Sequence, residues 1–82
     1  MEKPEVIKTV QDRLTRVNGG IEFEIIEDGV RLDDSWWYVP VVAHRGGRDV
    51  LREVTIQIFA NIETELEDEF NLTVLFIPAT AA

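Results

Sequence analysis

The chain has 82 residues, of which 16 are acidic and 8 basic, for a formal net charge of −8. This length fits one domain over residues 1–82, and the charge disfavours nucleic acid and anionic membranes as partners because phosphate groups repel an acidic surface. With no cysteine and one histidine, disulfides, thiolate metal sites and histidine metal clusters are excluded. We expect no bound cofactor and no metal.

No targeting or membrane-spanning segment is expected. Met1–Glu5 is not followed by the apolar stretch of a signal peptide. No apolar run approaches the roughly 20 residues that cross a bilayer. We therefore expect a cytoplasmic location, and the absence of cysteine agrees with a reducing compartment.

The first predicted element is a helix over residues 4–17. Pro4 suits a first helical turn, and Asn18-Gly19-Gly20 provides a stop with positive φ. A narrow apolar stripe recurs at helical spacing, formed by Ile7, Val10, Leu14 and Val17. Such a stripe is typical of a helix that covers a sheet.

A half-buried strand is predicted at residues 21–25, where three apolar residues alternate with Glu22 and Glu24. Val30–Leu32 follows, between turn signals at Asp28-Gly29 and Asp33–Ser35. This short segment either prolongs the strand past a bulge or forms a strand of its own.

The stretch Trp36–Ala43 predicts a strand that is apolar on both faces. Side chains alternate across a strand, so Trp37, Val39, Val41 and Ala43 share one face while Trp36, Tyr38, Pro40 and Val42 share the other. Pro40 has no N–H to donate, which favours an edge position. The strand at 21–25 would then lie in the middle of the sheet and pair with it antiparallel.

A basic loop, residues 44–49, leads into the second helix. Asp49 is a plausible N-cap, and the residues before it are His44, Arg45, Gly46, Gly47 and Arg48. Free N–H groups at a helix start, glycines that admit a ligand and two arginines suit a small anion. The simpler interpretation is a glycine turn with solvated arginines, and catalysis by His44 is the least favoured reading.

The second helix is predicted from Asp49 to Phe70, with Asn71 ending it in the left-handed conformation. Its broad apolar arc consists of Leu51, Val54, Ile58, Phe59, Ile62, Leu66 and Phe70. Acidic residues crowd its last two turns and oppose the helix dipole, namely Glu63, Glu65, Glu67, Asp68 and Glu69. A solvated face explains them most simply, and a basic partner or divalent cation is the functional alternative.

The last predicted strand is Leu72–Ile77, closed by Pro78 and followed by a tail at 79–82. A strand–helix–strand crossover places it parallel to Trp36–Ala43. With Pro40 at an edge, the spatial strand order would be 2-1-3. The expected fold is thus an α+β two-layer sandwich of order α-β-β-α-β, with two helices on one face of a mainly antiparallel three-stranded sheet and an optional short strand at 30–32.

Two helices cover one face of such a sheet, so its second apolar face needs an explanation. We expect Trp36, Tyr38, Val42, Val74 and Phe76 to share that outer face. Helix ends and loops could cover them, or the face binds a second copy of the chain, another protein or a ligand. Self-association ranks first among the functional readings, because two-fold dimers are the commonest soluble oligomers and Trp and Tyr are enriched at interfaces.

The sequence offers few candidate catalytic residues, since it has no cysteine, one histidine and no sequence context that activates Ser35. The expected function is therefore a non-enzymatic protein-interaction module, self-associating as a homodimer or binding another protein. The alternative is a domain that binds a small anion or nucleotide through the 44–49 loop.

Overall fold

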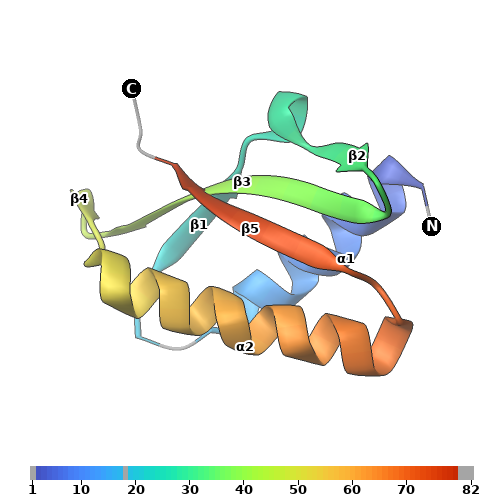
Figure 1. The fold of residues 1–82 in the computed structure, drawn as a ribbon. Helices are drawn as coiled ribbons and strands as arrows, with labels where there is room; N and C mark the ends of the chain where they lie inside the picture. The colour runs from blue at the N-terminus through green and yellow to red at the C-terminus, as the bar shows by residue number, and fades with distance from the viewer. Residues whose placement is uncertain (1, 18, 80–82) are drawn as a thin grey trace.

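The computed structural model describes residues 2–17 and 19–79 and confirms the α+β class. Asn18 of the predicted helix stop and residues 80–82 of the predicted tail lie outside these residues, while Gly19 and Gly20 have the expected positive φ of 105° and 72°. Figure 1 shows the elements in chain order. They are α1 (Lys3–Thr15), β1 (Glu22–Ile25), the 3₁₀ turn η1 (Glu27–Gly29), β2 (Arg31–Asp33), β3 (Trp36–Arg45), β4 (Arg48–Asp49), α2 (Arg52–Phe70) and β5 (Val74–Ala79).

The strand β3 is the centre of the sheet, so its predicted edge position and the spatial order 2-1-3 are wrong. Along one side, β3 pairs antiparallel with β2 and then with β1. Along the other side it pairs parallel with β5 and antiparallel with the two-residue β4. The parallel direction of β5 is confirmed, and Val30–Leu32 resolves into the separate short strand β2.

Pro40 is tolerated in this central strand because the chain beside it leaves the sheet. The β1 ladder ends at Ile25 opposite Val41, and the β2 ladder begins at Arg31 opposite Tyr38. The carbonyl of Pro40 accepts the N–H of Ile26 at 2.9 Å. Since the N–H and C=O of a strand residue point to the same side, the missing N–H of Pro40 faces the η1 excursion, where the ladder is interrupted.

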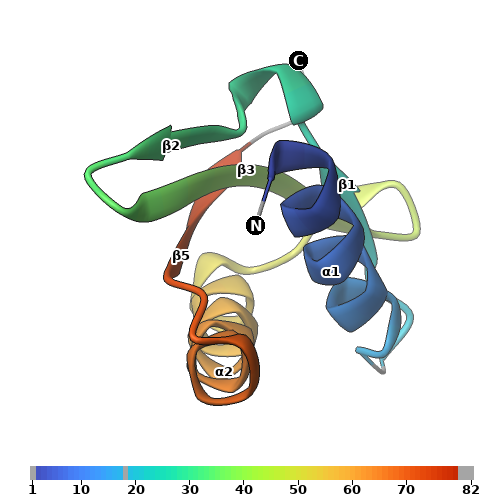
Figure 2. The same ribbon diagram turned by 90° about the vertical axis from the view of Figure 1, so that its right-hand side faces the viewer.

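The core lies between the sheet and both helices, which cover the same sheet face (Figure 2). The inner residues of β3 are Trp37, Val39 and Val41, all buried. Around them pack the buried side chains of the other elements: Val6, Val10 and Leu14 of α1, Phe59, Ile62 and Leu66 of α2, Ile25 of β1, and Val74 and Phe76 of β5. The two-layer sandwich is confirmed, but its sheet has five strands and not the three that were predicted.

Most element boundaries shift by one to three residues from the prediction, and at two of them the expected role of a residue is wrong. The helix α2 begins at Arg52 with Leu51 at its N-cap, so Asp49 does not cap it. The strand β5 runs to Ala79 and contains Pro78, which does not close it. The other end of α2 agrees with the prediction, because Asn71 adopts the left-handed conformation with φ of 52° and ψ of 38°.

Candidate protein interface

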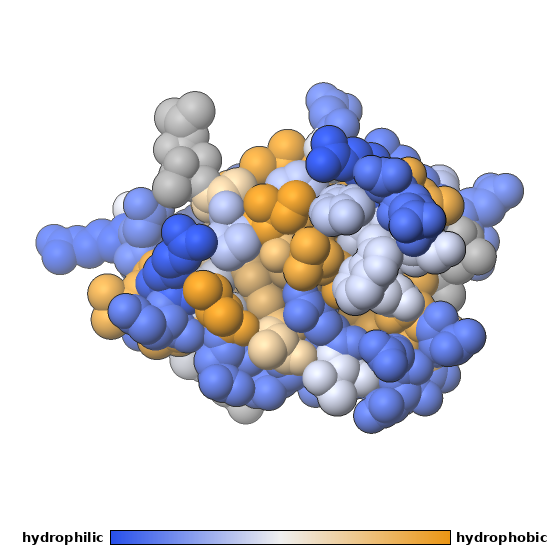
Figure 3. Space-filling view, in the orientation of Figure 1, coloured by the Kyte–Doolittle hydropathy of each residue, from blue (hydrophilic) through white to orange (hydrophobic). Residues whose placement is uncertain are grey.

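The outer sheet face, defined here by the side chains that point away from the helices, carries large exposed apolar groups. Directly paired strand residues share a face, so the register places Leu75 beside Tyr38 and Ile77 beside Pro40. The exposed fractions are 45% for Trp36, 40% for Leu75 and 38% for Ile77. In Figure 3, apolar and weakly polar surface gathers over β5 and β3 and is bordered by hydrophilic residues.

The assignment of Val74 and Phe76 to this face is wrong. Val74 pairs with Trp37 and Phe76 with Val39, so both point into the core, where they are 3% and 5% exposed. Leu75 and Ile77 occupy the outer face in their place. Because β5 is apolar on both sides, its alternation defines two sets of residues, and only its register with β3 shows which set lies outside.

The outer face is covered in part. Val42 is buried at 4% exposure, and Pro40 is half-buried. Tyr38 is also half-buried, and the guanidinium of Arg31 lies over its ring at 5.1 Å from the centroid, a cation–π contact. Exposed apolar surface is therefore concentrated at Trp36, Leu75 and Ile77.

The free edge of β5 is closed to a further strand. The N–H of Trp37 donates to the carbonyl of Thr73 at 2.9 Å, so odd-numbered residues of this segment face β3 and even-numbered ones face outward. The outward N–H of Phe76 donates to Oε2 of Glu63 on α2 at 2.9 Å. Pro78, the next outward residue, has no N–H. A carboxylate cap and a proline are devices that prevent edge-to-edge pairing.

The basic residues 44–49 form a β-hairpin and do not lie at a helix start. Gly46 and Gly47 have positive φ of 58° and 78°, as the central residues of a type I′ turn require. The flanking residues pair across the turn, Arg45 with Arg48 and His44 with Asp49. A Gly-Gly pair between strands is a hairpin signal that the sequence contained. The geometric premise of an anion site at the N-terminus of α2 is therefore wrong.

His44 and Arg45 contact the β1 side of the molecule. Nδ1 of His44 lies 3.8 Å from Oε2 of Glu22. The Arg45 guanidinium passes close to the backbone of Gly19, where an added Cβ would lie 3.4 Å from its Nη2. Arg45 and Arg48 are direct strand partners and share a face of the hairpin, whereas His44, as the neighbour of Arg45 in the strand, points to the opposite face.

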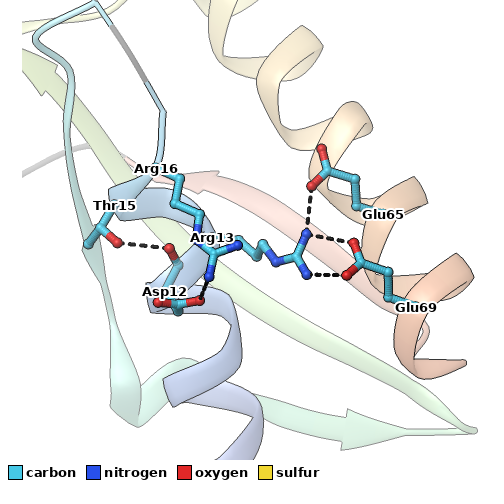
Figure 4. A network of polar contacts seen from close by, with 6 residues as sticks. All are labelled: Asp12, Arg13, Thr15, Arg16, Glu65 and Glu69. Atoms are coloured by element: carbon cyan, nitrogen blue, oxygen red, sulfur yellow. Dashed lines mark hydrogen bonds and ion pairs between the residues drawn. The ribbon is translucent and has the colours of Figure 1, made fainter.

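The acidic end of α2 has structural partners that explain part of its charge. Arg13 of α1 reaches across to α2 and donates to Glu65 at 2.9 Å and to Glu69 at 2.7 and 2.5 Å (Figure 4). This Arg13 bridge joins the two helices and separates the like charges of Glu65 and Glu69. With Glu63 bound to β5, three of the five acidic residues serve the fold.

The hydrogen bonds of the Arg13 bridge shift the pKa values of Arg13 and Glu69 in opposite directions. The hydrogen bond from Arg13 lowers the pKa of Glu69, and the same bond raises the pKa of Arg13. A carboxyl whose pKa is lower in the folded than in the unfolded chain binds fewer protons when folded, so the free energy of unfolding rises with pH in that range. The stabilisation is present above the ordinary glutamate pKa and is lost as the pH falls through the lowered value.

Replacing Arg13 with methionine is expected to flatten the acid side of the stability profile. Urea unfolding between about pH 3 and pH 6 measures this as a smaller slope of the unfolding free energy against pH. Lys8→Met is the matched control, since it removes one positive charge from the same helix and Lys8 is exposed. Equal slopes for the two variants would show that the bridge does not set the pH dependence.

Neither α1 nor α2 has the length and apolarity needed to cross a bilayer. Within residues 2–17 and 19–79, no group of three or more His, Asp or Glu side chains is arranged to hold a metal ion.

Comparison of the chain with protein-family models, with curated proteins and with solved structures found no match.

Proposed function

We propose that this protein is a non-enzymatic protein-interaction module that self-associates through its outer sheet face. The observation that carries the proposal is the apolar surface formed by Trp36, Leu75 and Ile77 on the sheet face opposite the helices. A solvated antiparallel sheet face is normally polar, and exposed apolar patches of this kind often mark interaction sites.

A second copy of the chain is the favoured partner for two physical reasons. A domain of this size buries only about 60–65% of the surface of its unfolded chain, so the free energy of unfolding of the monomer is small. Additional burial in a dimer increases it. A face that can pair with its own copy needs only two-fold symmetry, which is the commonest symmetry of soluble oligomers. Since the β5 edge is blocked by Glu63 and Pro78, association is expected face to face.

The expected affinity is modest. The exposed apolar area occupies only part of one small sheet, and small interfaces belong to weak or transient complexes. We expect a dissociation constant in the range of about 1–100 µM, so sedimentation equilibrium should span protein concentrations on both sides of it.

Replacing Trp36 with glutamate is expected to weaken the dimer about tenfold or more, because aromatic interface residues carry a large share of binding energy. The matched control is Leu32→Glu. Leu32 is 56% exposed and pairs with Trp37, so its side chain lies on the inner face of the sheet, the same face as Trp37. Both variants gain the same charge, and only the Trp36 variant should lose association.

A second variant, Trp36→Lys, separates burial from net charge. It reduces the negative charge of the protein and should still weaken the dimer. Sedimentation of the unmodified protein as a monomer at every concentration would overturn the proposal. Equal weakening by Leu32→Glu and Trp36→Glu would also overturn it, because the outer face would then have no special role.

A further inference from the structure

We propose that the free edge of β1 binds an extended segment of another protein as an added strand, with lysine or arginine side chains of that segment facing Glu22 and Glu24. This edge is separate from the outer-face surface formed by Trp36, Leu75 and Ile77. The proposal therefore goes beyond self-association and does not depend on it.

The edge of β1 is open, unlike the edge of β5. Within residues 2–17 and 19–79, β1 pairs with β3 alone, and it lies at the border of the sheet opposite β5 (Figure 2). The N–H of Ile26 donates to the carbonyl of Pro40 at 2.9 Å. In this antiparallel pair the even-numbered residues of the segment therefore bond to β3, while Phe23 and Ile25 turn their N–H and C=O groups outward.

These outward groups of Phe23 and Ile25 are available to a further strand. Among the residues that the structure describes, neither their N–H nor their C=O groups have a hydrogen-bond partner. A row of unpaired backbone groups at a sheet edge is the surface to which an extended peptide adds as a strand. At β5 the same kind of row is blocked by Glu63 and Pro78.

A groove beside this edge can receive the inward side chains of the added strand. It lies between α1 and β1 and has a volume of about 400 Å³. Side chains of directly paired strand residues share a face, so a residue added beside Phe23 points toward this groove. Half-buried Phe23 and Ile21 make part of its wall apolar, which favours an apolar side chain at that position. The other lining residues are Gln11, Leu14, Thr15 and Glu22.

The outer side of the same edge is acidic. Glu22 pairs with His44 and Glu24 with Val42, so both carboxylates lie on the outer face, and both residues are exposed. Within the described ranges Glu24 forms no ion pair, and Glu22 has one, with His44 at 3.8 Å. Oppositely charged pairs across neighbouring strands stabilise a sheet. A segment with lysine or arginine at two alternate positions therefore complements this edge.

The same two charges disfavour β1 of a second copy as the added strand. In antiparallel pairing of two copies, Phe23 opposite Phe23 places Glu22 beside Glu24, and Phe23 opposite Ile25 places Glu24 beside Glu24. Like charges directly opposite each other destabilise a pair of strands, and charged edge residues prevent self-pairing in this way. The partner is therefore a segment of different sequence that carries positive charge.

A synthetic peptide tests the proposal. The probe is the end-blocked heptapeptide Thr-Lys-Val-Lys-Val-Lys-Thr, which reads the same in both directions. Titration into the full chain, followed by NMR, should give a dissociation constant of about 10–500 µM. At saturation, hydrogen exchange at the N–H groups of Phe23 and Ile25 should slow about tenfold or more, because they gain partners. The N–H of Glu24 faces β3 already and should change least.

Charge reversal shows whether the peptide binds at β1 or is attracted by the negative charge of the whole protein. The double variant Glu22→Lys/Glu24→Lys should bind the lysine peptide about tenfold or more weakly. It should instead bind the peptide with glutamate in place of lysine. The matched control, Glu67→Lys/Asp68→Lys, changes the net charge equally at exposed positions on α2 and should bind the lysine peptide within a few-fold of the unmodified protein.

Circular dichroism confirms that each variant is folded. Equal weakening by the two double variants would overturn the proposal, because general charge attraction would then explain the binding. Binding that leaves exchange at Phe23 and Ile25 unchanged, or no binding at about 1 mM peptide, would overturn it as well. None of these results affects the self-association proposed above, which sedimentation of the Trp36 variants tests separately.

Discussion

Replacing Phe59 with alanine is expected to destabilise the protein by about 3–5 kcal/mol, as large-to-small substitutions at buried aromatic positions do. Phe59 is 3% exposed at the centre of α2. Its ring stacks on Phe76 of β5 with centroids 4.7 Å apart and contacts Phe23 of β1 at 6.2 Å. The substitution therefore opens a cavity where the helix meets both sides of the sheet.

The expected consequence is the loss of a large fraction of the total free energy of unfolding. At about 0.05–0.15 kcal/mol per residue, a domain of this length has a total stability of only about 4–12 kcal/mol. Guanidinium titration followed by circular dichroism measures the shift of the midpoint. Ile56→Ala is the matched control on the same helix, since Ile56 is 47% exposed, and it should cost less than about 1 kcal/mol. Similar midpoints for the two variants would contradict the described core.

Replacing Gly29 with alanine is expected to cost about 1–3 kcal/mol, the range for a group forced into occupied space. A Cβ on Gly29 would lie 2.7 Å from Cγ of Pro40. The proline ring is bonded at both ends to the backbone of the central strand, so it cannot rotate away as a long side chain would. The η1 turn or β3 must shift, and either movement disturbs the interruption that allows Pro40 in the sheet.

The partner substitution makes this prediction specific. In a Pro40→Ala background the atom that clashes is absent, so Gly29→Ala should cost less than about 0.5 kcal/mol there. A double-mutant cycle in urea measures the difference as a coupling energy between the two positions. Additive effects of the two substitutions would show that the close approach of η1 to Pro40 does not limit stability.

Local sequence signals predicted most of the elements of this fold. The helical spacing of Val10 and Leu14 predicted α1, and the alternation of Glu22 and Glu24 with apolar residues predicted β1. Asn71 ends α2 as expected because its side chain tolerates the left-handed conformation. These features depend on residues close in sequence, so they can be read without knowing the rest of the structure.

The wrong predictions concern residues whose local preference is satisfied by more than one structure. Pro40 has no N–H, and an edge is the usual place for such a residue, but an interrupted ladder beside a central strand satisfies it equally well. Gly46-Gly47 before a predicted helix start indicates a loop that leads into that helix, but the two residues form the turn of a hairpin. In both cases the deciding contact is with a segment outside the motif itself.

For the candidate interface, too, local sequence patterns predict one part and contacts between distant segments decide the other. From Trp36-Trp37-Tyr38 the sequence by itself determined that β3 has two apolar faces and that one of them is left over when two helices cover the other, because alternation in a strand is a local property. It also determined the acidic charge and the absence of cysteine chemistry. The tertiary structure alone decided which residues of β5 join the outer face and that Glu63 closes the β5 edge. Those facts depend on the register between strands distant in sequence, which is set by the packing of the whole sheet against its helices and which a single-residue shift would reverse.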